Sequence, residues 1–215
     1  MTDAPGPRTG PAGPDPGSEP GPSDTIVVRR AVASDDAFLR RMLAVAADWR
    51  PGAVVRSAAE VLQDPAIAHY VEGWPRDGDV GVVAVDGAEP VGAAWARFAA
   101  GGTTGYGFVA ADVPELTIGV VADRRGRGVG RRLLTALIAA ARRDRIDRIS
   151  LSVEADNPAS ALCLDLGFTR VGGTDDAPTM LLDRERGRVG GWPPTDGVCD
   201  GVGDGVGPHD GPVGG

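Results

Sequence analysis

The chain has 215 residues, 42% of them apolar, and a formal net charge of −8 at pH 7. This apolar content is enough for one domain with a buried core, and the acidic balance excludes a general nucleic-acid binder, which would show a basic excess. No apolar run reaches the ~18 residues of a membrane span, and the N-terminus lacks the apolar core of a signal peptide. Two cysteines are too few for a disulfide framework, and the histidines form no metal-ligand cluster with them. We therefore expect a cytoplasmic, metal-free protein with no membrane or nucleic-acid partner.

The two ends of the chain differ in composition from the rest. Residues 1–24 and 184–215 are rich in proline, glycine and acidic residues and hold few large apolar side chains. Such segments cannot bury enough apolar surface to offset their chain entropy, so we expect both tails to be disordered. The remaining residues, 25–183, have the length of a single domain.

The first half of that domain shows strand alternation, short helical segments and a hairpin signal. The hairpin signal is the sequence Asp-Gly-Ala-Glu-Pro at 86–90, which is typical of a tight turn between two strands. In chain order we expect a strand at 25–30, a helix capped by Ser34 and running to about Ala47, short helices at 57–62 and 65–74, and strands at 80–85 and 91–98.

The second half begins with a glycine-rich loop at 99–114, which leads into a central strand. The resulting order, β-α-α-β-β-β-α-β-α-β-β, predicts an α/β fold in which a mixed sheet carries helices on both faces. The expected elements are the central strand 116–121, a helix over about 129–141, a strand at 148–153, a short helix at 158–166, and strands at 168–171 and 179–182.

The turn between the central strand and the long helix organises the rest of the chain. It holds Gly126, Gly128 and Gly130, whose missing side chains let backbone N–H groups approach a ligand. The first N–H groups of a helix lack internal partners and lie at the positive end of its dipole, so the turn predicts an anion site. Five arginines surround it and favour a multiply charged anion over a merely solvated basic turn. They are Arg124, Arg125, Arg127, Arg131 and Arg132.

Two nucleotide-binding patterns fail here in detail. A P-loop ends in Gly-Lys-Ser/Thr, and this chain contains no lysine. The dinucleotide pattern G-x-G-x-x-G would need glycine at Arg131, and its acidic residue should close the next strand, which Asp147 instead opens. The pattern Arg125-x-x-Gly128-x-Gly130 instead resembles the acyl-CoA-binding motif of the GCN5-related N-acetyltransferase (GNAT) superfamily, Arg/Gln-x-x-Gly-x-Gly/Ala.

The resemblance covers nearly all of residues 25–183 and implies a GNAT-like fold, a mostly antiparallel mixed sheet with a central β-bulge or splay. It also implies acetyl-CoA as co-substrate, with its pyrophosphate at the glycine turn and its pantetheine arm along the central strand. Gly119 interrupts that strand, which marks a bulge or a close backbone approach. The cofactor-binding residues implied by the family are Ile118, Val120, Val121, Arg125, Gly126, Gly128, Val129, Gly130, Arg131 and Asn157.

A second landmark is the segment 157–168, Asn-Pro-Ala-Ser-Ala-Leu-Cys-Leu-Asp-Leu-Gly-Phe. It resembles the GNAT segment Asn-Pro-Ala-x-x-Leu-Tyr-x-x-x-Gly-Phe, whose asparagine contacts pantetheine and whose tyrosine often protonates the departing thiolate. In this chain Cys163 stands at the tyrosine position. A thiol with an ordinary pKa of roughly 8.5 could act as that acid, and the alternative is a small buried residue that only packs.

Glu115, at the start of the central strand, is the candidate general base, because GNAT proteins often hold a glutamate on this strand that deprotonates the acceptor amine. The alternative is a surface glutamate, and a register slip of one residue would turn its side chain to the other face. Residues 48–79 and the loop 99–114 are expected to form the acceptor pocket, because they concentrate aromatic and polar groups. These are Trp49, Arg50, His69, Tyr70, Trp74 and Tyr106.

Together the two landmarks predict an enzyme, an N-acetyltransferase that transfers acetyl from acetyl-CoA to a primary amine of a small molecule or peptide. We expect direct attack in a ternary complex, at the splay between the central strand and residues 148–153, in a monomer or homodimer. The missing tyrosine leaves open a non-catalytic acyl-CoA-binding or sensing module. Acetylation of protein N-termini or lysines would instead require an open peptide groove.

Overall fold

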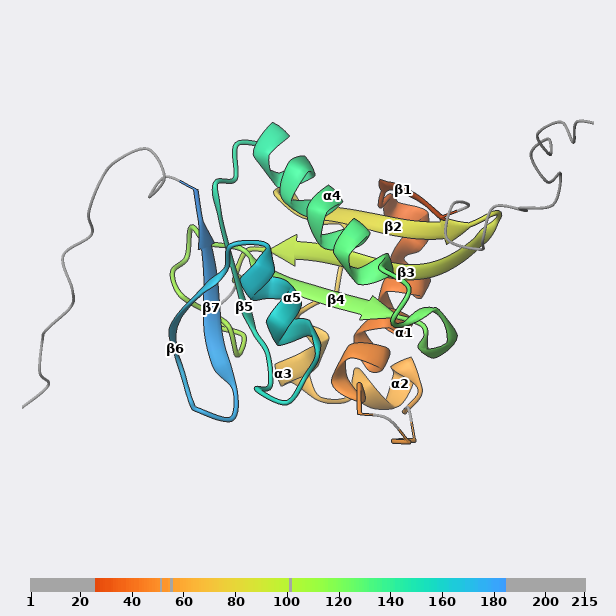
Figure 1. The fold of residues 1–215 in the computed structure, drawn as a ribbon, viewed down its shortest axis with the longest axis horizontal. Helices are drawn as coiled ribbons and strands as arrows, with labels where there is room; N and C mark the ends of the chain where they lie inside the picture. The colour runs from red at the N-terminus through yellow and green to blue at the C-terminus, as the bar shows by residue number, and fades with distance from the viewer. Residues whose placement is uncertain (1–25, 51, 55, 101, 185–215) are drawn as a thin grey trace, which may run out of the picture.

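The computed structural model describes residues 26–50, 52–54, 56–100 and 102–184. The predicted disordered tails, apart from Arg184, lie outside these residues, as does Cys199. The described strands form one seven-stranded sheet in the order β1-β2-β3-β4-β5-β7-β6 (Figure 1). All neighbouring strands are antiparallel except β4 and β5, which are parallel. The predicted mixed, mostly antiparallel α/β sheet is therefore confirmed.

The strands lie close to where side-chain alternation predicts them. The hairpin between the second and third strands turns at Gly87 and Ala88, inside the predicted turn sequence. The strands are β1 Ile26–Arg30, β2 Val80–Asp86, β3 Glu89–Arg97, β4 Glu115–Val120, β5 Arg148–Ser152, β6 Thr169–Gly173 and β7 Pro178–Asp183.

The helices differ more from the expectation at their starts and ends. Ser34 caps nothing, because residues 33–35 form a short 3-10 helix (η1) and the Asp35 carboxylate accepts from Val32 N at 2.8 Å. The helix expected over 65–74 ends at Ala68. The remaining helices are α1 Asp36–Ala47, α2 Ala58–Val61, α3 Pro65–Ala68, the 3-10 turn η2 Ala122–Arg124, α4 Val129–Arg143 and α5 Ala159–Asp165.

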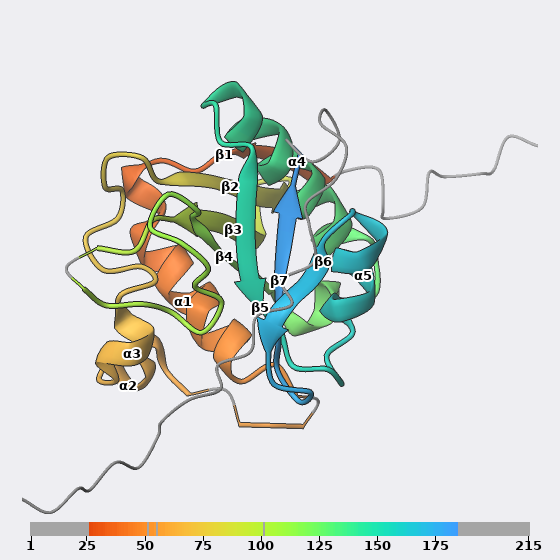
Figure 2. The ribbon, with the colours of Figure 1, turned by 90° about the vertical axis from the view of Figure 1, so that its left-hand side faces the viewer.

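Strand alternation divides the core between the two faces of the sheet. On β2 and β3, Val82 and Ala94 pack with the α4 side, whereas the alternate residues Val83 and Trp95 pack with α1. Figure 2 shows α1, α2 and α3 on one side of the sheet and α4 and α5 on the other. A side chain on the central strands therefore belongs to one of two separate environments.

The two central parallel strands part almost at once. Glu115 and Ser150 are their only register pair, and Pro114 O accepts from Ser150 N at 3.0 Å. On the other side of β4, Val121 N donates to Val91 O on the β3 side at 3.0 Å. Because backbone groups alternate along a strand, those of Ile118 and Val120 face the opening beside β5. The predicted splay is thus present at the end of β4.

Gly119 lies directly beneath α1. A Cβ atom at this position would overlap the carbonyl oxygen of Met42. The register between β3 and β4 has no shift, so this ladder contains no bulge, and the close backbone approach is the explanation that applies. Without a side chain at Gly119, α1 packs against the strand that borders the splay.

We expect Gly119→Ala to destabilise the chain by about 1–3 kcal/mol, because the added methyl group overpacks a contact with backbone atoms. The control is Gly172→Ala in β6, where a Cβ would meet no atom within 4 Å. Urea unfolding of both variants measures the difference. Equal stability of the two variants would show that α1 shifts away from β4 without cost.

Candidate active site

The glycine turn after β4 is open and exposes helix N–H groups. Gly126 and Gly128 have φ of +72° and +79°, values that side chains rarely allow, and a Cβ at either would meet no atom within 4 Å. Gly128 is the N-cap of α4, and the first helical bond runs from Arg132 N to Gly128 O at 3.1 Å. The preceding N–H groups of the helix have no acceptor within it, and its first turn contains no acidic residue. This geometry fits an anion.

The arginines contribute less to this turn than their number suggests. Most of them bind other parts of the chain, so the expectation that all five surround one anion is too broad. Arg127 is exposed and makes no ion pair within the described residues. The partners are Asp123 at 2.7 Å and Asp86 at 3.4 Å for Arg124, Asp165 at 2.8 Å for Arg131, and Ile26 O at 3.1 Å for Arg132.

The side chain of Arg125 braces the end of β4 against the end of α1. Its Nε donates to Val120 O at 3.0 Å and its Nη1 donates to Trp49 O at 2.9 Å. The first of these carbonyl groups faces the splay. The predicted contact of Arg125 with a pyrophosphate stays a prediction, and the observed contacts assign it to shaping the opening.

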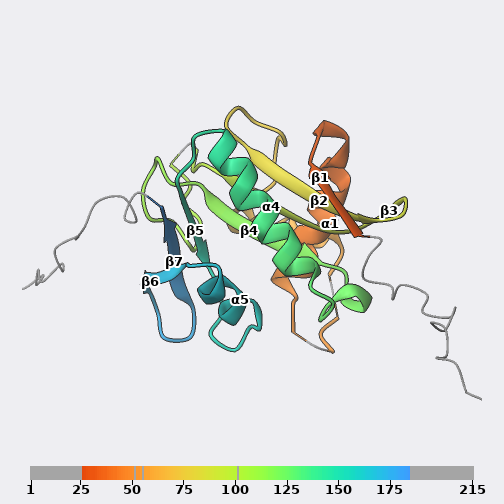
Figure 3. The ribbon, with the colours of Figure 1, turned by 45° about the horizontal axis from the view of Figure 1, so that its top comes forward.

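The segment around Asn157 lies beside the glycine turn. The Oδ1 atom of Asn157 accepts from Ala159 N at 2.9 Å and so starts α5. A Cβ on Gly130 would lie 3.4 Å from Leu162 Cδ2, which places α5 against the first turn of α4. Figure 3 shows both helices on the same face of the sheet. The two sequence landmarks therefore meet in space.

Cys163 points into the core on this face. Its side chain is 2% exposed and belongs to the apolar cluster that includes Leu134 and Phe168. Burial raises the pKa of the thiol to about 11. This placement favours the packing alternative, and the acid role of Cys163 stays a prediction.

Glu115 lies on the opposite face. It pairs with Arg97 across the β3–β4 ladder, so its side chain is on the α1 side with Trp95, which answers the register question left by the sequence. Its Oε1 accepts from Tyr70 Oη at 2.7 Å and from Gly107 N at 2.6 Å. Burial raises the pKa of the carboxyl group, and these two hydrogen bonds oppose the rise. Glu115 is therefore no ordinary surface glutamate.

The loop between β3 and β4 reaches Glu115 through two glycines that sequence reasoning did not single out. A Cβ at Gly105 would overlap the Glu115 carboxylate and the Tyr70 hydroxyl, and one at Gly107 would overlap the backbone of Leu151 in β5. Only residues without side chains fit there. The Gly-Tyr-Gly triplet at 105–107 was the available signal.

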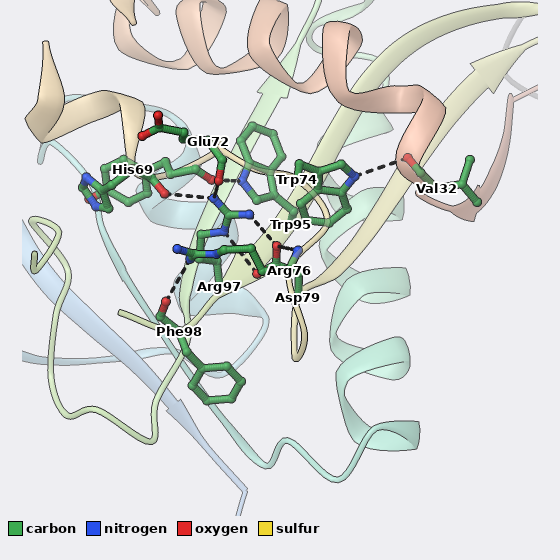
Figure 4. A network of polar contacts seen from close by, with 10 residues as sticks. Val32, His69, Glu72, Trp74, Arg76, Asp79, Trp95, Arg97 and Phe98 are labelled. Atoms are coloured by element: carbon green, nitrogen blue, oxygen red, sulfur yellow. Dashed lines mark hydrogen bonds and ion pairs between the residues drawn. The ribbon is translucent and has the colours of Figure 1, made fainter. Parts of the chain in front are cut away.

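The structure brings together only part of the predicted acceptor pocket. His69, Tyr70 and Glu115 line one pocket with Phe98 and Phe108. Trp74 is a core residue instead, because it is buried and its Nε1 donates to Val32 O at 3.3 Å (Figure 4).

Trp49 and Arg50 lie apart from that pocket, beside the loop after β5. The Nε1 atom of Trp49 donates to Glu154 Oε2 at 2.9 Å, and Arg50 pairs with the same carboxylate oxygen at 2.6 Å. Glu154 was not predicted as a site residue. It links the end of α1 to the strand on the far side of the splay.

A buried polar network fixes the chain segment that carries Tyr70. Arg97 and Asp79 form an ion pair whose side chains are both almost fully buried. Arg97 Nη1 also donates to His69 O at 3.0 Å and to Glu72 O at 2.8 Å, while Trp95 Nε1 donates to Tyr70 O at 2.7 Å. Figure 4 shows these side chains converging on the segment from β3.

The splayed parallel pair and the open helix N-terminus agree with the acetyltransferase fold that the sequence motifs resemble. The sequence model of the Acetyltransferase (GNAT) family matches residues 42–168, more than half of the chain. The protein therefore belongs to the GNAT acetyltransferase family. No curated protein matches the sequence.

Solved structures agree on the fold. The GNAT domain of S. lividans PAT is 25% identical, with a TM-score of 0.52 over 73% of this chain and 89% of that one. The ribosomal-protein-alanine N-acetyltransferase of Brucella melitensis is 25% identical, with a TM-score of 0.52 over 72% and 98%. The structure of yncA from Salmonella typhimurium, which contains acetyl-CoA, is 23% identical, with a TM-score of 0.54 over 74% and 94%.

None of the helices among the described residues is both long enough and apolar enough to cross a membrane. Among the same residues, no three His, Cys, Asp or Glu side chains are grouped so that they could hold a metal ion.

We expect Gly128→Val to weaken acetyl-CoA binding at least about tenfold, because a side chain would enter the open turn and force its backbone out of the left-handed region. The control is Gly87→Val in the β2–β3 hairpin, which also has positive φ and open space around its Cβ position. Both variants carry similar backbone strain, so calorimetric titration with acetyl-CoA separates binding from folding. Equal affinity in the two variants would exclude the turn as the anion site.

Proposed function

We propose that the protein is an N-acetyltransferase that moves the acetyl group of acetyl-CoA to a primary amine of a small molecule or peptide. The observation that carries the proposal is the splay between β4 and β5, which joins two different chemical environments. On one face lies the open N-terminus of α4, and on the other lies the Glu115 carboxylate. This arrangement supports direct transfer within a ternary complex, because cofactor and acceptor can reach the splay from different faces.

The residues present fit acetyl-CoA as co-substrate, which would supply the activated acetyl group. The open turn at Gly126 and Gly128 leaves room for a diphosphate against helix N–H groups. The backbone groups of Ile118 and Val120 face the splay, where they suit a chain of amides such as pantetheine. The family resemblance also implies contacts of the cofactor with Val121, Val129, Arg131 and Asn157, which stay predictions. Val129 is buried in the core, and Arg131 pairs with Asp165.

Glu115 would take the proton from the acceptor amine. An ammonium group must lose a proton before its nitrogen can attack a carbonyl carbon, and a base works best with a pKa close to the working pH. Burial moves the pKa of Glu115 upward in that direction, while the donors at Oε1 keep the carboxylate oriented. Glu115 also lines the pocket that His69 and Phe108 line, where an acceptor amine could reach it.

A non-catalytic acyl-CoA-binding or sensing module is the alternative function. The observation that favours it is Cys163, which stands where the family usually has tyrosine and is buried. Water or the proton of the acceptor amine can complete departure of a thiolate, so the loss of this phenol does not by itself exclude transfer.

We further propose that residues 25–183 act as one domain in the cytoplasm, as a monomer or homodimer.

The deciding experiment follows thiol release from acetyl-CoA with a panel of primary amines, from polyamines and amino acids to peptides, for the wild type and Glu115→Gln. We expect turnover of at least one amine and a drop in kcat of about 10²–10⁴ in the variant, the usual contribution of a positioned base. Acetyl-CoA affinity should not change. Glu89→Gln at the exposed start of β3 controls for the lost charge.

Folding should not account for that drop. Because the folded pKa of Glu115 is raised, its favourable contribution exists below the unfolded pKa and is lost as the pH rises through the folded pKa. At pH 7 the glutamine variant should therefore be at least as stable as the wild type. Tight acetyl-CoA binding without turnover of any amine would support the sensing module instead.

The role of Cys163 is tested by Cys163→Ala. Because the thiol is buried and its pKa is about 11, we expect the variant to keep kcat within about threefold while its melting temperature falls from lost packing. A general acid contributes about 10²–10⁴ in rate. A loss of that size in a folded alanine variant would make the thiol the working acid.

A further inference from the structure

We propose that Tyr70 is a positioning residue that holds the Glu115 carboxylate in place as the base, through a hydroxyl group fixed between the β3–β4 loop and β4. This inference rests on the proposed function for its catalytic meaning. The effect of Tyr70 on the titration of Glu115 can be measured without turnover. The positioning role and the proposed function can therefore fail separately.

The direction of the hydrogen bond follows from the partners of the hydroxyl group. Tyr106 N lies 2.9 Å from Tyr70 Oη and can only donate, so the phenol oxygen accepts from it. The single proton of the phenol is then left for Glu115 Oε1, 2.7 Å away. Gly107 N donates to the same oxygen at 2.6 Å. Tyr70 thus accepts a hydrogen bond from the loop and donates one to the carboxylate.

The ring of Tyr70 has little freedom to move away. It is 9% exposed and packs with Val71 and Trp95 in the core on the α1 face. The backbone carbonyl of Tyr70 accepts from Trp95 Nε1. Arg97 donates to the carbonyl groups of His69 and Glu72 before and after it, as Figure 4 shows. Anchors on the backbone before, at and after Tyr70 therefore aim the phenol before any substrate arrives.

The charged and titratable groups around Glu115 come from three elements. His69 and Tyr70 follow α3, Arg97 is opposite on β3 and is paired with Asp79, and Tyr106 belongs to the loop. Burial, ahead of its neighbouring charges, lowers the pKa of His69, so it adds little positive charge near neutral pH. The two donors at Oε1 are therefore what offsets the cost of burying the Glu115 carboxylate.

Tyr70 also stays a donor over the working range of pH. Burial, followed by the nearby Glu115 carboxylate, raises the pKa of Tyr70 well above its ordinary value. The phenol therefore keeps its proton while Glu115 titrates. A hydrogen bond to the charged form of a group lowers the pKa of an acid, so removing it should move the titration of Glu115 upward.

The test is Tyr70→Phe, which keeps the buried ring and removes the hydroxyl. We expect the acidic limb of the kcat/KM profile, measured with the best amine of the panel, to move up by about one to two pH units, the size of one hydrogen bond to a charged group. At high pH, where Glu115 is ionised in both proteins, most of the rate should return. A residue that only supports the fold would lower the rate at all pH values alike.

The chain offers a matched control and an opposite perturbation because it contains only two tyrosines. Contrary to the expectation from the sequence, Tyr106 does not line the pocket of Glu115, and its ring is 69% exposed. Tyr106→Phe removes only this exposed hydroxyl and should leave the acidic limb where it is. In that variant Tyr70 is the single tyrosine, so biosynthetic 3-fluorotyrosine alters it alone. The more acidic phenol donates more strongly and should move the limb to lower pH, while the ring grows only by the small difference between fluorine and hydrogen.

Carboxyl NMR of glutamate-labelled protein, with the Glu115 signal assigned from its loss in Glu115→Gln, gives a readout independent of turnover. We expect the Glu115 titration to rise in Tyr70→Phe and to fall with fluorotyrosine. An unchanged titration in both overturns the proposal. A shifted titration with an unmoved kcat/KM limb overturns the catalytic role of Tyr70. If the wild type acetylates no amine, the proposed function fails, and the titration still decides whether Tyr70 holds Glu115.

Discussion

The parting of β4 from β5 after a single residue pair is the constraint on which the site depends. Backbone groups inside a sheet need partners, and beyond this pair those of Ile118 and Val120 have none on β5. The carbonyl group of Val120 accepts a hydrogen bond from the guanidinium of Arg125 instead. The opening persists because two other contacts fix β4 in place. These are the continuous ladder to β3 and the packing of α1 against Gly119.

The Arg97–Asp79 ion pair fixes the other border of the site. Two charges buried almost completely lose their hydration, and their mutual attraction repays this only when further hydrogen bonds satisfy the remaining donors. Arg97 finds those acceptors in the carbonyl groups of His69 and Glu72 (Figure 4). The hydrogen bonds of this one buried guanidinium thus order the irregular segment 69–72, which lies outside any helix or strand. Tyr70 lies within that segment, so its position is fixed as well.

Features set by local sequence could be predicted, and features set by distant partners could not. The strands, α4 and the glycine turn follow from alternation, helical spacing and the conformations that glycine permits. Arg131 pairs with Asp165 and Arg124 pairs in part with Asp86, two acidic residues far away in the sequence, so counting charges around the turn overstated the anion site. Whether Glu115 faced α1 or α4 depended on its pairing with Arg97, which no pattern within β4 reveals.

The same distinction explains the smaller errors. Ser34 and Asp35 are both residues that commonly cap helices, yet neither side chain caps α1. The Asp35 carboxylate instead accepts from Val32 N at 2.8 Å and pairs with Arg29 at 2.7 Å. Trp74 looked like a pocket residue because aromatic groups were scarce, yet its indole fills the core beside Trp95. The Gly105–Gly107 contacts were missed because a glycine-rich loop gives no periodic signal, although only glycine fits against Glu115 and β5.

The two faces of the sheet differ in proton chemistry, because one offers a candidate base and the other offers no good acid. The chemistry of the thiolate leaving group explains why the proposed transfer does not require a strong acid. The α1 face has a buried carboxylate suited to accepting a proton, whereas Cys163 on the α4 face has a pKa of about 11 and gives one up reluctantly. An alkyl thiol has an ordinary pKa of roughly 8.5, so a departing thiolate is already a stable anion near neutral pH and needs little help from an acid. Removing a proton from an ammonium at neutral pH is the harder task. In the proposed reaction Glu115 takes that proton, and the hydrogen bonds from Tyr70 and Gly107 orient its carboxylate for this step.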